Sequence, residues 1–194
     1  MAYKVFGNEN PVTAELGSLT QGLGFPLRPV ETFAASPIET IVLFAPSFVA
    51  QEPTGLDNPL QLTFGSPQSN VFIDLDANGL VTILQAGTYK FELRAAVGRT
   101  SVPGAAIILA RSLINGVQLG NSLHANIPDL NTSLPLFAAF TRSFSVNDTW
   151  ASEIMRSSTG IDSGGLYPET TAVSGWANSP SVQVVVTRLS VEAN

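Results

Sequence analysis

The segment Tyr89–Val97 alternates between apolar side chains at its odd positions and mostly charged side chains at its even positions. Successive side chains of a β-strand point to opposite faces, so this alternation predicts a strand with one face on a core and the other toward water. Shorter runs of the same kind follow one another from Pro37 onward, divided by Gly, Pro and Asn. Since no segment keeps a helical period over about ten residues, the pattern predicts an all-β chain.

Two Asn-Gly pairs mark tight turns between these runs. Asn115-Gly116 separates Ala105–Ile114 from Val117–Ile127, and Asn78-Gly79 follows another alternating run. Asn and Gly supply the positive φ angles that a two-residue hairpin turn needs. Ala105–Ile114 is the one run that could also be helical, but its β-branched residues favour a strand. Roughly eight or more strands predict an antiparallel jelly-roll sandwich over residues 37–194. The other expected strands cover residues 38–44, 60–64, 71–75, 81–83, 134–146, 150–155 and 181–191.

Residues 1–36 differ from the rest of the chain. Glycine and proline interrupt every potential strand or helix there, yet the segment is too apolar for a solvated tail. We expect an extended N-terminal arm that lies on a neighbouring surface; an irregular loop packed on its own domain is the alternative. The segment shows no secretory signal pattern. The apolar residues expected to dock the arm include Tyr3, Phe6, Leu16 and Phe25.

Charged residues make up only 12% of the chain, whereas hydrophobic residues make up 44%. About 25% charged residues is usual in soluble globular proteins, so we expect other subunits to cover part of the surface. A surface of neutral Ser, Thr, Asn and Gln is the alternative. A net charge of −6 opposes binding to nucleic acid or to acidic membranes. The chain has no cysteine, which excludes disulfides and thiolate chemistry.

Residues suited to catalysis are sparse. His124 is the only histidine, and no Gly-x-Ser-x-Gly motif accompanies it. We expect it on a strand, facing solvent or a subunit interface. The acidic residues are dispersed over turns and solvent faces, so their spacing selects no pair for general acid and base work. We therefore expect no enzyme activity, no catalytic residue and no cofactor.

The segment Asp74–Gly79 matches the first half of an EF-hand calcium loop, with oxygen ligands at Asp74, Asp76 and Asn78. The position of the bidentate carboxylate is Gln85, which cannot supply that ligand, and the flanking residues are strand-like. The interpretation as a β-hairpin turn is therefore favoured over a metal site.

The order of the predicted elements resembles a known family. The turn at Asn78-Gly79 precedes Gly87–Phe91, a long apolar strand ends at Asn115-Gly116, and a valine-rich strand, Val182–Leu189, lies near the end of the chain. The pattern resembles the C1q/TNF-like trimeric jelly-roll domain of bacteriophage virion structural proteins, although the long loop at 157–180 and the lack of a collagen-like stalk depart from it. The resemblance implies a homotrimer in the virion, made in the host cytoplasm, that decorates or cements the capsid or forms a head fibre. Its partners would be itself and the major capsid protein or other virion proteins.

Under this interpretation six apolar residues form the core and the trimer seam: Tyr89, Phe91, Leu93, Val182, Val184 and Val186. The alternative function is a receptor-binding or adhesion tip of a phage tail fibre. In that case the loop at 157–180 contacts a host-surface receptor through Trp176 and Tyr167. Core or interface positions are the commoner outcome for a tryptophan, and they are favoured for both Trp150 and Trp176. A carbohydrate-active enzyme is the least supported function.

Overall fold

A computed structural model describes residues 38–99, 104–130 and 132–190, and the compact unit Glu39–Ser190 contains a two-layer β-sandwich. The described residues form strands and turns without any α-helix, as the sequence predicts. The predicted arm, with Tyr3, Phe6, Leu16 and Phe25, lies outside the described residues, so its role stays a prediction.

The first sheet is built around one long central strand. Its main path runs β1 (Ile38–Ser47), β12 (Val182–Ser190) and β6 (Gly87–Gly98), and β9 (Leu134–Phe144) pairs with the other edge of β6. The short β11 (Gly165–Leu166) pairs with the end of β6. The partners of β6 are all antiparallel to it, and β9 pairs with it from Leu134 to Phe144.

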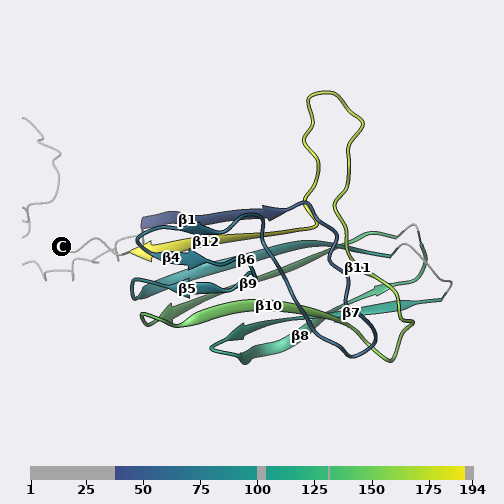
Figure 1. Cartoon of the computed structure of the whole chain (residues 1–194), viewed down its shortest axis with the longest axis horizontal. Coiled ribbons are helices and arrows are strands. Elements are labelled where there is room, and N and C mark those ends of the chain that lie inside the picture. The colour runs from purple at the N-terminus through teal and green to yellow at the C-terminus, as the bar shows by residue number, and fades with distance from the viewer. Residues whose placement is uncertain (1–37, 100–103, 131, 191–194) are drawn as a thin grey trace, which may run out of the picture. The chain divides into compact units, whose positions relative to one another are not determined.

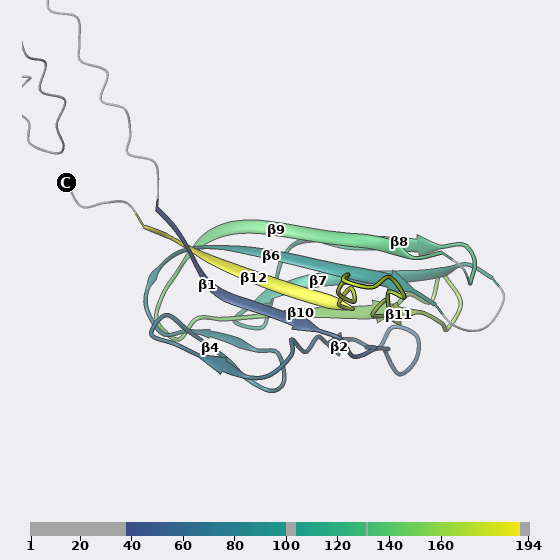
Figure 2. The ribbon, with the colours of Figure 1, turned by 90° about the horizontal axis from the view of Figure 1, so that it is seen from above.

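The second sheet lies against the first (Figure 2). Its order is β3 (Gln68–Ser69), β4 (Ile73–Leu75), β5 (Val81–Ile83), β10 (Thr149–Arg156), β7 (Ala106–Ile114) and β8 (Val117–Ile127), and β2 (Leu60–Gln61) pairs with β10. The chain crosses between the sheets at β1–β2, β5–β6, β6–β7, β8–β9, β9–β10 and β10–β11. This repeated crossing between two antiparallel sheets makes the sandwich a jelly roll.

The core lies between the sheets and is aromatic at its centre. The Phe91 ring lies 4.9 Å from the Trp150 ring and stacks on Phe140 at 5.2 Å between centroids, and Phe64 stacks on Trp150. Trp150 is only 1% exposed, as the favoured interpretation of this tryptophan predicts. Ring pairs of this kind contribute beyond the area they bury, so they join β6, β9 and β10.

All six residues that the sequence assigned to the core and the trimer seam lie in this core, and each is at most 3% exposed. The alternation of β6 and the valines of β12 place these side chains on the inner face of the first sheet, where the second sheet covers them. They therefore have almost no surface left for a neighbouring subunit. The structure thus places these residues in the core, and their part in a trimer seam stays a prediction.

The Asn-Gly turns differ from each other. Asn115 and Gly116 both have positive φ, 50° and 75°, and join β7 directly to β8 as predicted. At the other turn only Gly79 has positive φ, because the Asp76 carboxylate accepts hydrogen bonds from the backbone N–H groups of Asn78 and Leu80 and closes the turn itself. The prediction of a hairpin there is confirmed, but that of a positive φ at both residues is wrong.

Two predicted strands are shorter than expected. The Asn70 side chain accepts hydrogen bonds from the N–H groups of Phe72 and Ile73, which turns the chain and leaves Val71 75% exposed. In the segment 60–64, only Leu60–Gln61 pairs as a strand, although Leu62 and Phe64 are both buried. The buried side chains thus follow the predicted alternation as far as Phe64, whereas strand pairing ends at Gln61.

Candidate functional site

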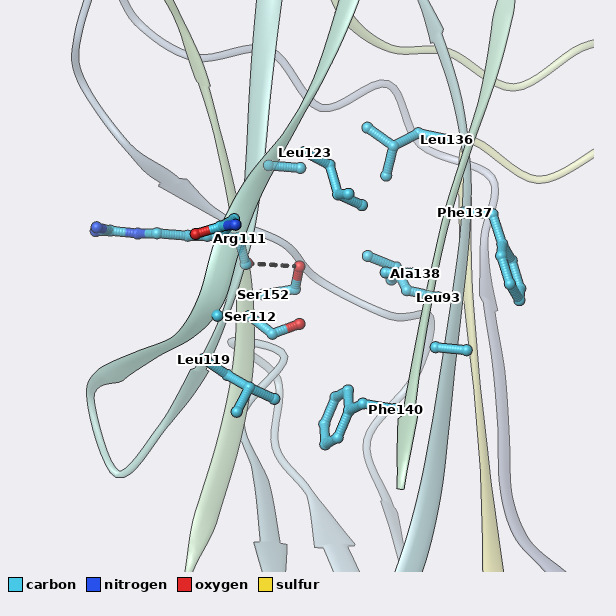
Figure 3. A pocket seen from close by; sticks show the side chains of 14 residues that line it. Leu93, Arg111, Ser112, Leu119, Leu123, Leu136, Phe137, Ala138, Phe140 and Ser152 are labelled. Carbon is cyan, nitrogen blue, oxygen red and sulfur yellow. Dashed lines mark hydrogen bonds between the residues drawn. The ribbon is translucent and has the colours of Figure 1, made fainter. Parts of the chain in front are cut away.

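An apolar cleft opens between the two sheets at the side formed by β8 and β9 (Figure 3). Its volume is about 510 Å³, which is within the range of ligand and partner pockets. Of the residues that line it, Leu93, Ala110 and Leu136 are buried, and the other apolar side chains around it include Leu119, Leu123, Ala138 and Phe140. The strand pattern aims these side chains inward, since they occupy the inner-face positions of their strands.

The mouth of the cleft coincides with a break in the pairing of β7 and β8. Ala110 is opposite Leu123 and Ser112 is opposite Leu119, so the single residue Arg111 faces the three residues 120–122 of β8. Gly120 has a φ of 64°, and the Gln118 amide donates to the Gly120 carbonyl at 3.1 Å. An unequal pairing of this kind makes a strand bulge out of its sheet. Gly120 and Asn121 both line the cleft.

The inside of the cleft is nearly uncharged. Arg111 is the one charged residue that lines it, and Figure 3 shows its side chain pointing away from the space between the sheets. On the outer face this guanidinium bonds the Glu153 carboxylate, with 2.8 Å between Nε and the oxygen. The Ser152 hydroxyl is buried and donates to the Arg111 carbonyl at 3.1 Å. A partner in this cleft would therefore bind through apolar contacts, with few polar groups to orient it.

Both strands beside the cleft are free edges within the described residues. The backbone of β8 pairs only with β7 and that of β9 only with β6, and the two strands contact each other where the sheets meet (Figure 2). Together they carry one residue with a permanent charge, Arg142. Proteins usually guard a free edge with charges, proline or bulges. Here Pro135 and the bulge in β8 interrupt the edge, and Leu136–Phe140 carries no such guard.

His124 lies on β8 opposite Leu109, on the outer face of the second sheet, and is exposed. The neighbouring Leu123 points into the cleft, so the alternation of the strand aims His124 away from it.

The residues of the calcium candidate lie in the hairpin formed by β4 and β5. Both hydrogen bonds to Asp76 Oδ1 measure 2.8 Å, and Asp74 lies within β4 opposite Thr82. Throughout residues 38–99, 104–130 and 132–190, no three His, Asp or Glu side chains are close enough to hold a metal ion. The geometry therefore supports the hairpin interpretation of Asp74, Asp76 and Asn78.

Tyr167 and Trp176 belong to one loop but to different ends of it. Tyr167 donates its N–H to Ala96 in β6 and lies half-buried beside Gly98, at the base of the loop. Trp176 lies beyond the bridge between Glu169 and Ser179, and its side chain is 76% exposed. The structure does not bring the two rings into one platform, and the expectation of a core or interface position holds for Trp150 but not, within this chain, for Trp176.

Comparisons with known proteins identify no family. No protein-family profile matches the chain, and no curated protein matches it. Among solved structures it is similar to the globular domain of zebrafish complement 1qA protein, with 14% sequence identity over 78% of this chain and 97% of that one, and a TM-score of 0.40. With so partial a superposition, the jelly-roll assignment depends on the strand order described above. No helix within the described part of the chain is long and apolar enough to cross a membrane.

The cleft residues Leu119, Leu123, Leu136, Ala138 and Phe140 were not predicted as a site. One signal in the sequence does point to them, because residues 117–127 and 134–141 contain no Asp, Glu, Lys or Arg at all. A solvent-facing strand normally shows polar or charged residues at alternate positions. Two consecutive stretches without any charged side chain are typical of a surface that a partner covers.

Proposed function

We propose that the chain is a non-enzymatic structural protein of a virus particle, which assembles as a homotrimer through the edge formed by β8 and β9. The observation that carries the proposal is the apolar cleft flanked by two free edges that together carry a single charged residue. Contact with a second copy would bury the cleft and cover the unpaired backbone groups of both strands. It would also account for the low charge of the whole chain.

A second apolar area gives the edge something to bind. Phe44 of β1 is 53% exposed on the face opposite the buried Leu43 and Ala45, and Phe48, directly after that strand, is 52% exposed. This area and the cleft are different surfaces of the same chain. A contact between two different surfaces is heterologous, and it forms a closed ring when the rotation between copies allows it. A ring of three copies agrees with the trimer that the resemblance implies.

The proposed role in the virion depends on two features of the sequence. One is the resemblance to trimeric jelly-roll proteins of phage particles, and the other is the apolar segment 1–36, which would dock on the capsid. Binding to purified capsids should be lost when residues 1–36 are removed, while the jelly roll remains folded. Binding to host cells that survives this removal would instead support the adhesion tip.

The assembly is tested by the mass of the full chain in light scattering. We expect three times 20.4 kDa for the parent chain and a monomer for Leu123→Glu combined with Phe137→Glu. Both side chains are partly exposed, at 38% and 54%, so the fold tolerates the change while the interface does not. Val173→Glu, at a 59% exposed site in the loop between β11 and β12 that stands away from both sheets, is the matched control and should stay trimeric. A monomeric parent chain, or a trimer that the double variant leaves intact, contradicts the proposed edge.

A further inference from the structure

The loop that contains Trp176 is a closed projection rather than a loose connection. Residues 167–181 join β11 to β12, and Figure 1 shows them standing away from both sheets. Glu169 and Ser179 exchange two backbone hydrogen bonds of 3.1 and 2.9 Å, and the Asn178 side chain accepts the N–H of Thr171. These contacts hold the two legs of the loop together below its tip.

The base of the loop is fixed to the first sheet. Ser181 is fully buried, and its hydroxyl bonds the carbonyls of Ser47 and Val49 at 3.0 and 2.6 Å. Its backbone N–H bonds the Ser47 carbonyl as well, and Tyr167 on the other leg bonds Ala96. Both legs therefore start from rigid strands, which limits the conformational entropy that the loop loses when it binds a partner.

The tip presents one large ring to solvent. The Trp176 N–H bonds the Val173 carbonyl at 3.2 Å around Gly175, whose φ of 85° is the left-handed conformation required at the third position of a type II turn. Trp176 is 76% exposed and Val173 59% exposed, whereas Trp150 is 1% exposed. A tryptophan usually buries most of its ring in a core or an interface. A closed turn with an uncovered ring is therefore arranged for contact with another molecule.

The side chains at the tip limit the chemical class of partner that it can bind. Residues 170–181 contain no charged side chain, and their polar groups are the hydroxyls of Thr and Ser and the amide of Asn178. An indole face stacks on the C–H face of a sugar ring, while hydroxyls and amides bond its hydroxyl groups. A protein hot spot is normally enclosed by a wider rim of contacts, and a membrane-binding segment carries Lys or Arg, neither of which this tip has.

We propose that this loop binds a neutral glycan, with the sugar stacked on Trp176. Neutral sugars are favoured over sialylated or phosphorylated ones, because the chain has a net charge of −6 and the tip offers no cation. The site is independent of the β8–β9 edge and of the role in the virion. A trimer would present three copies of it, so binding to a surface that carries many glycans would be strengthened by avidity.

The two tryptophans allow a direct test in the full chain. Trp150 is buried and Trp176 exposed, so acrylamide quenches the fluorescence of Trp176 selectively. Neutral hexasaccharides of glucose, galactose and N-acetylglucosamine serve as probes, with sialyllactose and phosphatidylcholine vesicles as comparisons. We expect at least one neutral oligosaccharide to protect Trp176 from quenching and shift its emission to shorter wavelength.

Two variants test whether the sugar binds at Trp176. By calorimetry, Trp176→Ala should bind the same sugar at least about tenfold more weakly, whereas Val71→Ala should bind like the parent. The emission of Trp150, which remains in both variants, reports whether the fold is intact. The proposal is overturned if no neutral oligosaccharide protects Trp176, if Trp176→Ala binds as tightly as the parent, or if only sialyllactose or the vesicles protect the ring.

Discussion

Gly79 and Gly116 have similar backbone angles but different surroundings in this fold. Gly79 and Gly116 have φ angles of 84° and 75°, a region that other residues enter only with strain. Gly116 has open space around the position of a Cβ atom. At Gly79, a Cβ would collide with the carbonyl oxygen of Leu62, in the segment that follows β2. Gly116 is thus required for its backbone angle alone, whereas Gly79 is required for its backbone angle and for its close packing against Leu62.

Alanine substitutions at these glycines should therefore have unequal effects. We expect Gly116→Ala to lower the free energy of unfolding by about 1 kcal/mol, which is the cost of a left-handed conformation for an L-residue. Gly79→Ala should cost at least about 3 kcal/mol, because the backbone of one of the two touching segments must also move. Urea unfolding followed by fluorescence measures both values. Equal losses in the two variants would mean that the turn moves freely away from Leu62.

At the scale of elements, two turns at one end of the second sheet are tied by side chains. The Asn115 amide in the β7–β8 turn donates to Asp148 at 2.8 Å, and its oxygen accepts the N–H of Thr149. Asp148 also accepts the backbone N–H of Ser145 at 2.7 Å. These hydrogen bonds, first that from Asn115, favour the charged carboxylate and lower the pKa of Asp148 below its usual value. The charge of Asp148 thus connects the β7–β8 turn to the β9–β10 turn.

This lowered pKa predicts a stability that depends on acid. The unfolded chain binds the proton more readily than the folded chain, so the contribution of Asp148 is complete above the unfolded pKa of about 3.8 and is lost as the pH falls through the lower folded pKa. In urea titrations Asp148→Asn should be less stable than the parent at pH 7, and the difference should narrow at pH 3. Asp57, whose pKa the Ser158 hydrogen bonds also lower, adds to the acid sensitivity that remains in the variant. A difference that is the same at both pH values would show that the charge of Asp148 contributes nothing.

The elements differ in how far the sequence predicts them. The position of β6, the limits of β8 and the turn at Asn115-Gly116 follow from local patterns, since alternation and positive φ are encoded within a few residues. The length of β4 was overestimated because the Asn70 side chain, which accepts the backbone N–H of Phe72, decides where the chain turns. The cleft was not predicted, because it requires β8 and β9, which pair in different sheets, to meet at one side of the sandwich. The break at Arg111 is equally a property of pairing between strands.

At the scale of the whole molecule, the low content of charged residues in the chain is also seen on its two free edge strands. The chain has 24 charged residues other than histidine among 194, and two complete edge strands carry only one of them. A monomer would leave the apolar cleft and the Phe137 ring in water. Burial of this area by association would stabilise the folded chain itself, so that folding and assembly become one equilibrium.

This linkage predicts that stability depends on protein concentration. If three unfolded chains are in equilibrium with one folded trimer, a tenfold rise in concentration stabilises each chain by about 0.9 kcal/mol. We therefore expect the urea midpoint of the parent chain to rise with concentration, and that of the Leu123→Glu, Phe137→Glu variant to stay constant. Unfolding followed by fluorescence, at one dilute concentration and at ten times that concentration, shows whether the midpoint depends on concentration. A parent midpoint that does not change would mean that the jelly roll is stable alone and that its edges, with their single charged residue, are tolerated in water, as the neutral polar residues on β8 would then allow.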